Sequence, residues 1–133
     1  MNSIHELLDN SARKYPDKSA IIFDDLRISF AELLKKTEFL SNLIQEKIST
    51  GNVISILCEN SPFFIISYFS VLKSGCIAHI IPPSISDFNL KEQIKETNPE
   101  MILSTRSFEQ KLNRTQLTKK IFFVENTIFS KVN

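Results

Sequence analysis

Apolar residues recur along this chain at two different spacings. In residues 4–15 and 30–48 they return every three or four positions, which is the period of an amphipathic helix. From residue 53 onward, short apolar runs alternate with segments of helical period. The expected strands are Val53–Cys58, Cys76–Ile81, Met101–Ser104 and Lys120–Val124. Because they alternate with helices, these strands are predicted to be parallel and joined by helical crossovers.

Capping residues and prolines predict where the helices begin and end. Capping boxes, in which a serine precedes Glu or Gln by three positions, stand at Ser3–Glu6, Ser29–Glu32 and Ser107–Gln110. The helices behind them are expected to stop at Pro16, at about Ile48 and at about Leu117. Asp87 is expected to cap a further helix that runs to Thr97.

The segment Pro62–Ser74 is the most apolar of the expected helices. Ser61 and Pro62 predict its start, and Gly75 predicts its C-terminal cap. Apolar side chains occur nearly all round residues 63–72, so this helix is expected to be sandwiched between layers or to meet a partner. A partner would most simply be a second copy, in a symmetric homodimer through Pro62–Ser74 or through the edge of the sheet.

These segments together predict an α/β fold. Asp24-Asp25, flanked by Ala20–Phe23 and Leu26–Ser29, indicates a short hairpin after the N-terminal helix. The rest is expected to form a mostly parallel sheet with helices on both faces. Residues 1–133 are predicted to be a single domain or subdomain, with an irregular tail over residues 126–133.

Composition and charge exclude several classes of function. The net charge is +1, which gives no strong field toward nucleic acid or a membrane. Glycine occurs only twice, at Gly51 and Gly75, so the chain holds neither a P-loop nor a dinucleotide-binding fingerprint. The longest apolar stretch is too short to span a bilayer, and no signal peptide is visible, so a cytoplasmic chain is expected.

Few residues are candidates for chemistry. His79, at the end of an expected strand, is a candidate general base, but no triad spacing accompanies it and a half-buried, hydrogen-bonded histidine is favoured. Asp24-Asp25 is a candidate cation site, although a polar turn is favoured. Glu59-Asn60-Ser61 stands at a strand-to-helix junction, where helix amides bind anions, but self-capping by Ser61 is favoured.

Three further groups of residues complete the candidates. A basic stretch, predicted to be a solvated helix face rather than a phosphate site, consists of Arg106, Lys111, Arg114, Lys119 and Lys120. An aromatic cluster, predicted to be core or interface rather than a ligand cage, consists of Phe63, Phe64, Tyr68 and Phe69. Cys58 and Cys76 are expected to be buried free thiols, and His5 and His79 do not suffice for a metal site. We therefore predict no catalytic, cofactor-binding or metal-binding residue in this chain.

Four motifs in order nevertheless resemble one family, the adenylate-forming ligases. Ile28–Leu33 (I-S-F-A-E-L) resembles the first core motif of that family, L-T/S-Y-x-E-L. Glu59–Pro62 and the apolar helix after it resemble the N-S-x-E-F stretch, with Phe63-Phe64 in place of the acidic residue and its neighbour. Leu72–Pro82 resembles the second core motif, L-K-A-G-x-x-x-V-P, and Asp87–Ser104 resembles the helix and strand that follow. The resemblance covers about residues 3–105.

The resemblance implies the N-terminal structural part of an enzyme that joins a carboxylic acid to ATP and passes the acyl group to a thiol. Acyl-CoA synthetases, peptide-synthetase adenylation domains and luciferases share this chemistry, and the acyl-CoA type is slightly favoured here. His79 and Pro83-Ser84-Ile85 depart from the family pattern and leave the type open. The phosphate loop and catalytic residues of the family lie further along, so the segment alone is expected to be inactive and to bind no cofactor.

The implied partners are the remainder of the ligase, in the same or a separate chain, and CoA or a carrier protein. ATP and Mg²⁺ are implied for the complete enzyme. A different class of function stays open, a non-catalytic interaction module derived from a truncated ligase homologue. A flavodoxin-like receiver or nucleotide-binding domain is disfavoured, because the sequence lacks its glycines and its acidic cluster at the strand ends.

Overall fold

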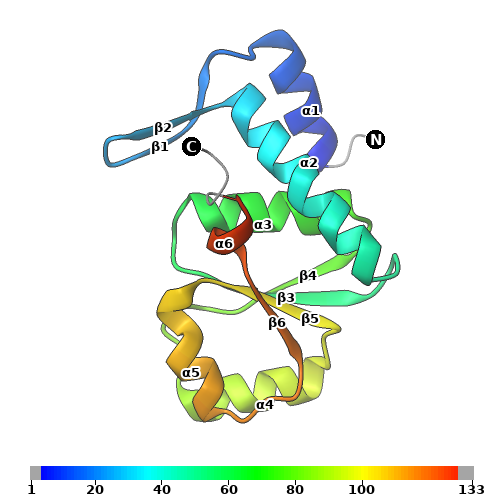
Figure 1. Cartoon of the computed structure of the whole chain (residues 1–133), viewed down its shortest axis with the longest axis vertical. Helices are drawn as coiled ribbons and strands as arrows, with labels where there is room; N and C mark the ends of the chain where they lie inside the picture. Colours follow the sequence, from blue (N-terminus) through cyan, green and yellow to red (C-terminus); the bar gives the residue numbers. More distant parts are fainter. Residues whose placement is uncertain (1–3, 129–133) are drawn as a thin grey trace.

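The computed structural model describes residues 4–128, and its centre is a four-stranded parallel sheet (Figure 1). The strand order is β4-β3-β5-β6, and every neighbouring pair is parallel. The strands are β3 (Val53–Leu57), β4 (Ile77–Ile80), β5 (Met101–Ser104) and β6 (Lys120–Phe123). The predicted parallel α/β sheet is therefore confirmed.

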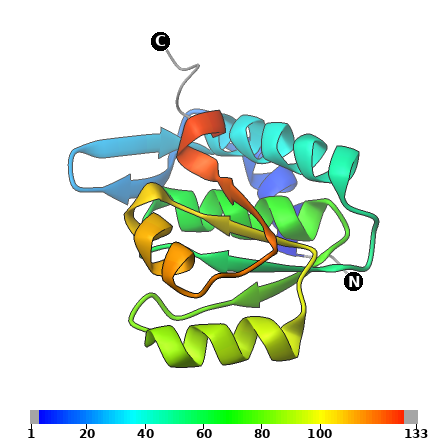
Figure 2. The ribbon, with the colours of Figure 1, turned by 60° about the horizontal axis from the view of Figure 1, so that its bottom comes forward.

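Helices lie on both faces of this sheet, as predicted (Figure 2). One face carries α3 (Pro62–Lys73) and, beside it, α2 (Phe30–Lys47), whose C-terminal half packs over β5 and β6, and α1 (Ile4–Lys14) lies farther out against these two helices. The other face carries α4 (Asp87–Thr97) and α5 (Glu109–Arg114), which follows the short 3-10 turn η1 (Arg106–Phe108). A short helix, α6 (Val124–Ile128), ends the described chain.

The alternation of side chains along each strand divides the core into two clusters. On β5, Met101 and Leu103 belong to the cluster under α2 and α3, whereas Ile102 belongs to the cluster over α4 and α5. All three side chains are buried, because a central strand of a covered parallel sheet meets helices on both sides. The apolar runs of the two central strands, β3 and β5, thus correspond to strands with two buried faces, whereas the edge strands β4 and β6 are partly exposed.

The N-terminal hairpin forms a separate two-stranded sheet. Strands β1 (Ser19–Phe23) and β2 (Leu26–Ser29) pair antiparallel around a turn in which Asp24 has a φ of 54°. Ser29 then begins α2 through the predicted capping box. Its hydroxyl accepts from the backbone N–H of Glu32, and the Glu32 carboxylate accepts from the backbone N–H of Ser29.

Several predicted boundaries are wrong. Ser86, not Asp87, caps α4, because its hydroxyl accepts from the backbone N–H of Asn89. The Ser107–Gln110 capping box does not form; Phe108 precedes α5, and the Ser107 hydroxyl is used elsewhere. The tail predicted to be irregular begins inside α6, and the predicted Ser3–Glu6 box depends on Ser3, outside the described residues.

Helix α3 is sandwiched rather than exposed. It contacts β3 and β4 on one side and α1 and α2 on the other, and no residue of α3 is among the exposed large hydrophobic side chains. Of the two alternatives for this helix, the structure shows burial between layers.

None of the described helices is long and apolar enough to cross a membrane.

The turn after α3 requires glycine for two separate reasons. Gly75 has a φ of 83°, and its N–H donates to Leu72 O while Cys76 N–H donates to Val71 O, which is a Schellman ending. A Cβ on Gly75 would also lie 2.8 Å from Thr50 Cγ2, in the turn between α2 and β3. Gly51 shares the positive φ, at 92°, but faces open space.

The two glycines therefore form a matched pair for mutation. Gly51→Ala is expected to lower the free energy of unfolding by about 1 kcal/mol, the cost of a left-handed alanine. Gly75→Ala is expected to cost about 2 kcal/mol or more, because the steric clash with Thr50 adds to the same strain. Adding Thr50→Ser to the Gly75→Ala chain removes the clashing methyl group and should bring its loss of stability down to that of Gly51→Ala. Urea denaturation measures all four chains, and equal losses for the two glycine variants would contradict the clash.

Candidate functional site

The strand order locates one place where a ligand site is expected in a sheet of this kind. From β3 the chain passes through α3 to β4 on one side, and α4 then returns it to β5 on the other side of β3. The connections diverge at the carboxyl ends of β3 and β5, and open α/β sheets bind ligands at such a point. The residues that follow these two strands are therefore the first candidates.

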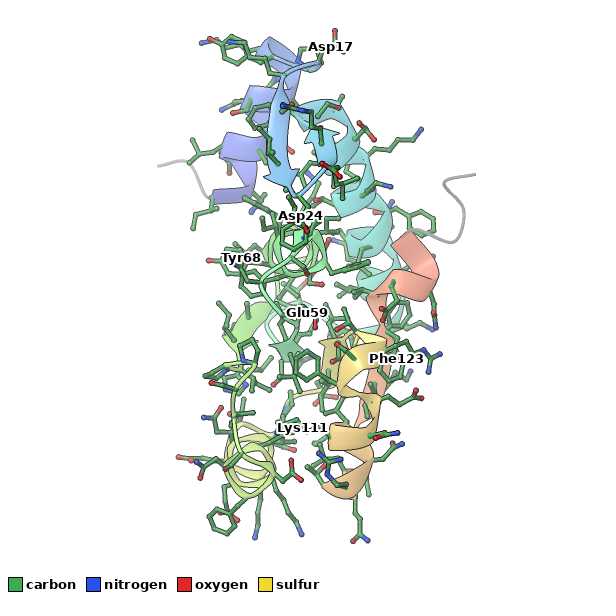
Figure 3. All side chains as sticks on the ribbon, turned by 90° about the vertical axis from the view of Figure 1, so that its left-hand side faces the viewer. Asp17, Asp24, Glu59, Tyr68, Lys111 and Phe123 are labelled. Carbon is green, nitrogen blue, oxygen red and sulfur yellow. The ribbon has the colours of Figure 1, made fainter. Side chains whose placement is uncertain are left out.

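A polar cluster of Glu59, Thr105 and Ser107 occupies this point. Glu59 follows β3, and its carboxylate accepts from Thr105 Oγ1 at 3.2 Å and from Ser107 Oγ at 2.7 Å, both after β5. The two hydroxyls are themselves 3.1 Å apart. Figure 3 shows Glu59 between the level of α3, marked by Tyr68, and that of α5, marked by Lys111. The cluster thus ties together two loops that are far apart in the sequence.

Arg106 extends the same connection to β6 and α6. Its backbone N–H donates to the Glu125 carboxylate, and its guanidinium lies over the Phe123 ring, 4.2 Å from the centroid. The guanidinium also pairs with Glu109 at 2.7 Å. Both charged side chains therefore have polar partners within the chain: Glu59 accepts hydrogen bonds from two hydroxyl groups, and Arg106 pairs with Glu109. These contacts hold the loops after β3, β5 and β6 together.

The anion site proposed for Glu59-Asn60-Ser61 is not supported by this geometry. The Ser61 hydroxyl donates to the Glu59 carbonyl oxygen at 3.1 Å and makes no capping bond to α3, so self-capping by Ser61 is wrong as well. An anion at this helix terminus would also approach the Glu59 carboxylate. Burial, and after it the negative charge of Glu59, raises the pKa of the Cys58 thiol to about 12, so Cys58 is a protonated core residue near neutral pH.

His79 lies on β4, away from the Glu59 cluster, as the hydrogen-bonded histidine that the sequence favoured. Its Nδ1 is 2.8 Å from Ser55 Oγ, on the neighbouring strand β3, where the two residues are direct partners in the register. The side chain is half-buried. The structure thus gives His79 a structural partner and brings no acid or nucleophile of the candidate set to it.

Asp24-Asp25 forms the exposed turn of the hairpin, as favoured. Within residues 4–128, no group of three or more His, Cys, Asp or Glu side chains is placed to hold a metal ion. Cys58 and Cys76 are buried free thiols, as predicted.

The basic stretch is largely paired with nearby polar groups. Asp87, at the start of α4, binds Lys111 at 3.0 Å and Arg114 at 2.7 Å, both on α5. Lys119 donates to the Asn98 side chain, and Arg106 pairs with Glu109. These partners fix α5 to α4 and argue against a phosphate-binding patch.

The aromatic cluster on α3 belongs to the core, as one of its predicted alternatives. Phe63, Phe64, Tyr68 and Phe69 are half-buried and pack against the cluster under α2 and α3. The Phe64 and Tyr68 rings are stacked at 6.1 Å, and the Tyr68 and Phe69 rings meet edge to face at 6.0 Å. The rings contact one another and enclose no ligand cage.

Sequence reasoning missed the Glu59–Thr105–Ser107 cluster. The sequence placed Glu59 and Thr105 each directly after a predicted strand, but it did not show that these two strands are neighbours. Ser107 was assigned to a capping box, and that assignment concealed its contact with Glu59. The available signal was the placement of polar residues after two parallel strands.

Removal of the Glu59 carboxylate should weaken the connection between the loops after β3 and β5. Glu59→Ala leaves two hydroxyl groups without their acceptor and is expected to lower the free energy of unfolding by about 2 kcal/mol. Glu92→Ala, which removes a carboxylate from the exposed face of α4, is the matched control and should change stability by less than about 0.5 kcal/mol. Chemical denaturation compares them, and a Glu59 variant as stable as the control would refute the structural role.

The ion pairs of Asp87 should be visible in a pH titration. Hydrogen bonds from Arg114 and then Lys111 lower the pKa of Asp87 from 3.8 to about 2. Because the folded-state pKa is the lower one, the stabilisation is present above about pH 4 and is lost as pH falls through 2. Carbon-detected NMR titration of Asp87 should give a midpoint near 2, and Arg114→Gln should raise that midpoint toward 3.8. A midpoint unmoved by Arg114→Gln would contradict this origin of the shift.

Comparison with known sequences gives a family. Residues 8–129 match the family described as AMP-binding enzyme. Bacitracin synthase 2 of Bacillus licheniformis is 27% identical over 132 residues, which cover 98% of this chain and 5% of that protein. Tyrocidine synthase 1 of Brevibacillus parabrevis is 28% identical over 109 residues, which cover 81% of this chain and 10% of that protein.

Solved structures share the fold at low sequence identity. O-succinylbenzoate Coenzyme A synthetase (MenE) of Bacillus subtilis, in complex with AMP, superposes with a TM-score of 0.78 at 19% identity over 90% of this chain and 31% of that chain. The N-terminal subdomain of Klebsiella oxytoca NpsA, in complex with 3-hydroxybenzoyl-AMSN, superposes with a TM-score of 0.86 at 17% identity over 100% of this chain and 33% of that chain. The chain thus spans about a third of these solved relatives and at most a tenth of the curated relatives above. Because the family match takes in nearly the whole described chain, the predicted resemblance to adenylate-forming enzymes is confirmed, and the chain belongs to the AMP-binding enzyme family.

Proposed function

We propose that this chain is the N-terminal structural part of an ATP-dependent acid–thiol ligase. The complete enzyme would join a carboxylic acid to ATP, release pyrophosphate, and pass the acyl group from AMP to a thiol of CoA or of a carrier protein. The observation that carries this proposal is the match to AMP-binding enzymes over residues 8–129, in a chain that spans about a third of its solved relatives. MenE and NpsA, solved with AMP and with an AMSN compound, support an adenylate as the shared intermediate.

In this proposal residues 1–133 act as one supporting subdomain. They hold the sheet and its helices, while the remainder of the ligase supplies the phosphate loop, the catalytic groups and the sites for ATP and Mg²⁺. The polar groups at the carboxyl ends of β3 and β5 support such a role, because Glu59, Thr105 and Ser107 bind one another. We accordingly assign no catalytic, cofactor-binding or metal-binding residue to this chain. In this proposal the remainder of the ligase determines whether the acyl group passes to CoA or to a carrier protein.

The predicted homodimer has a weaker basis than the ligase assembly. Phe64 and Phe69, on α3, are half-buried within the chain's own layers, so a dimer through Pro62–Ser74 would need side chains that already pack inside. A homodimer stays a prediction that sedimentation of the chain tests directly. The non-catalytic interaction module stays the alternative function, and the activity assay separates it from the ligase.

The test is ATP–pyrophosphate exchange with a panel of carboxylic acids. The chain alone should show no exchange, and the chain together with the polypeptide encoded directly downstream should show exchange that depends on Mg²⁺. The downstream polypeptide alone is the control and should be inactive or much less active. Saturable ATP binding by the chain alone in the micromolar range would overturn the proposed division of roles, and inactivity of the combined chains with every acid would favour the interaction module.

A further inference from the structure

The hairpin of β1 and β2 extends away from the layers of helices and sheet (Figures 1 and 2). It forms its own two-stranded sheet and does not pair with the four-stranded one. Its contacts to the rest of the described chain are chiefly with α2. A two-stranded hairpin is marginally stable in water unless its apolar face packs against other residues. Which residues cover this face therefore indicates where further packing is needed.

One face of the hairpin carries four apolar side chains in two cross-strand pairs. Ile21 is the partner of Ile28, and Phe23 is the partner of Leu26, nearer the turn. Because side chains alternate along a strand, positions 21 and 23 share one face with their partners at 28 and 26. This face is therefore an apolar strip that runs from the body of the molecule to the tip of the hairpin.

The chain covers only the inner half of this strip. Ile21 and Ile28 are 7% and 2% exposed, because they join the core under α1 and α2. Phe23 and Leu26, the outer pair, are 41% and 43% exposed. The outer pair overhangs the body, close to the tip that Asp24 marks in Figure 3. An apolar pair that continues a core face and then projects into water is typical of a surface that packs against another segment.

Other large apolar side chains of the described residues are exposed as well, and they are Ile4, Leu7, Tyr15, Ile22, Phe39, Ile77, Ile80 and Phe88. Ile77 and Ile80, on the edge strand β4, have an odd spacing that directs them to opposite faces of the sheet. Ile22 lies on the opposite face of the hairpin, where its cross-strand partner is the charged Arg27. The pair Phe23–Leu26 differs from these in that it continues a face whose inner half, Ile21–Ile28, is already buried.

We infer that the overhanging pair Phe23–Leu26 is a docking site for the remainder of the ligase. The inference rests on the proposed function. The length of the solved relatives indicates which segment would cover the pair. This chain matches 31% and 33% of two solved relatives with the same fold, so a complete enzyme would hold a body about twice as large beside it. Packing of that body on the outer pair would extend the core from Ile21–Ile28 along the strip without a change in the hairpin.

The experiment measures association of this chain with the separately expressed polypeptide encoded directly downstream. Phe23→Asp and Leu26→Asp should each weaken the complex by about tenfold or more, because each places a charge in the apolar contact. Phe88→Asp introduces the same change at an exposed position on α4 and should change the affinity by less than about twofold. Circular dichroism should show that all three variants keep the native fold, since the three side chains are substantially exposed in the wild-type chain.

A second measurement tests the same contact without mutation. Hydrogen exchange of the backbone amides in residues 22–27 should slow when the downstream polypeptide is added, whereas exchange in α4 should stay unchanged. Wild-type association with ATP–pyrophosphate exchange, but equal affinity of the hairpin variants and unchanged hairpin protection, would overturn the docking site and leave the proposed function intact. Absence of both association and exchange in the wild type would overturn the proposed function and the docking site together. Self-association that Phe23→Asp abolishes would assign the strip to a second copy and overturn the stated occupant.

Discussion

Burial of α3 between the sheet and α2 is the constraint on which the rest of the structure depends. The sheet side of α3 packs on β3 and β4, and its other side packs on α1 and α2. Buried serines let the two helices approach closely, and Ser70 Oγ donates to Ile66 O in α3 and to Thr37 O in α2. The N-terminal helices and the hairpin reach the core through this contact. The helix is apolar nearly all round because it packs against the sheet as well as against α1 and α2.

The parallel order of the strands determines where polar groups can meet. Because β3 and β5 are neighbours and point the same way, Glu59 and the hydroxyls of Thr105 and Ser107 follow their strands at the same edge of the sheet. Arg106 and Glu125 continue the connection to the end of β6. The resulting fastening fixes the loops at the place where sheets of this kind bind ligands, and it suits a segment that supports a site completed by other residues.

The outer half of the hairpin exposes an apolar surface, formed by Phe23 and Leu26, that the rest of the described chain does not cover. The sheet and its helical layers bury most of their apolar side chains in two clusters within the chain. Phe23 and Leu26 continue a buried face beyond the body that covers its inner half. A family whose solved members are about three times as long accounts for both properties, because a folded first part then presents one prepared surface to the part that follows.

The sequence by itself determined the elements and their local signals. Alternation of apolar runs with helical periods predicted the parallel sheet, the box at Ser29–Glu32 predicted the start of α2, and Gly75 predicted the end of α3, since each depends on neighbours within a few residues. The tertiary structure alone decided that Ser107 binds Glu59 rather than capping α5, and that α3 is sandwiched rather than exposed. It also showed which half of the hairpin strip α2 covers. These outcomes depend on contacts between segments far apart in the chain, and side-chain periodicity specifies a face to be buried without specifying what will bury it.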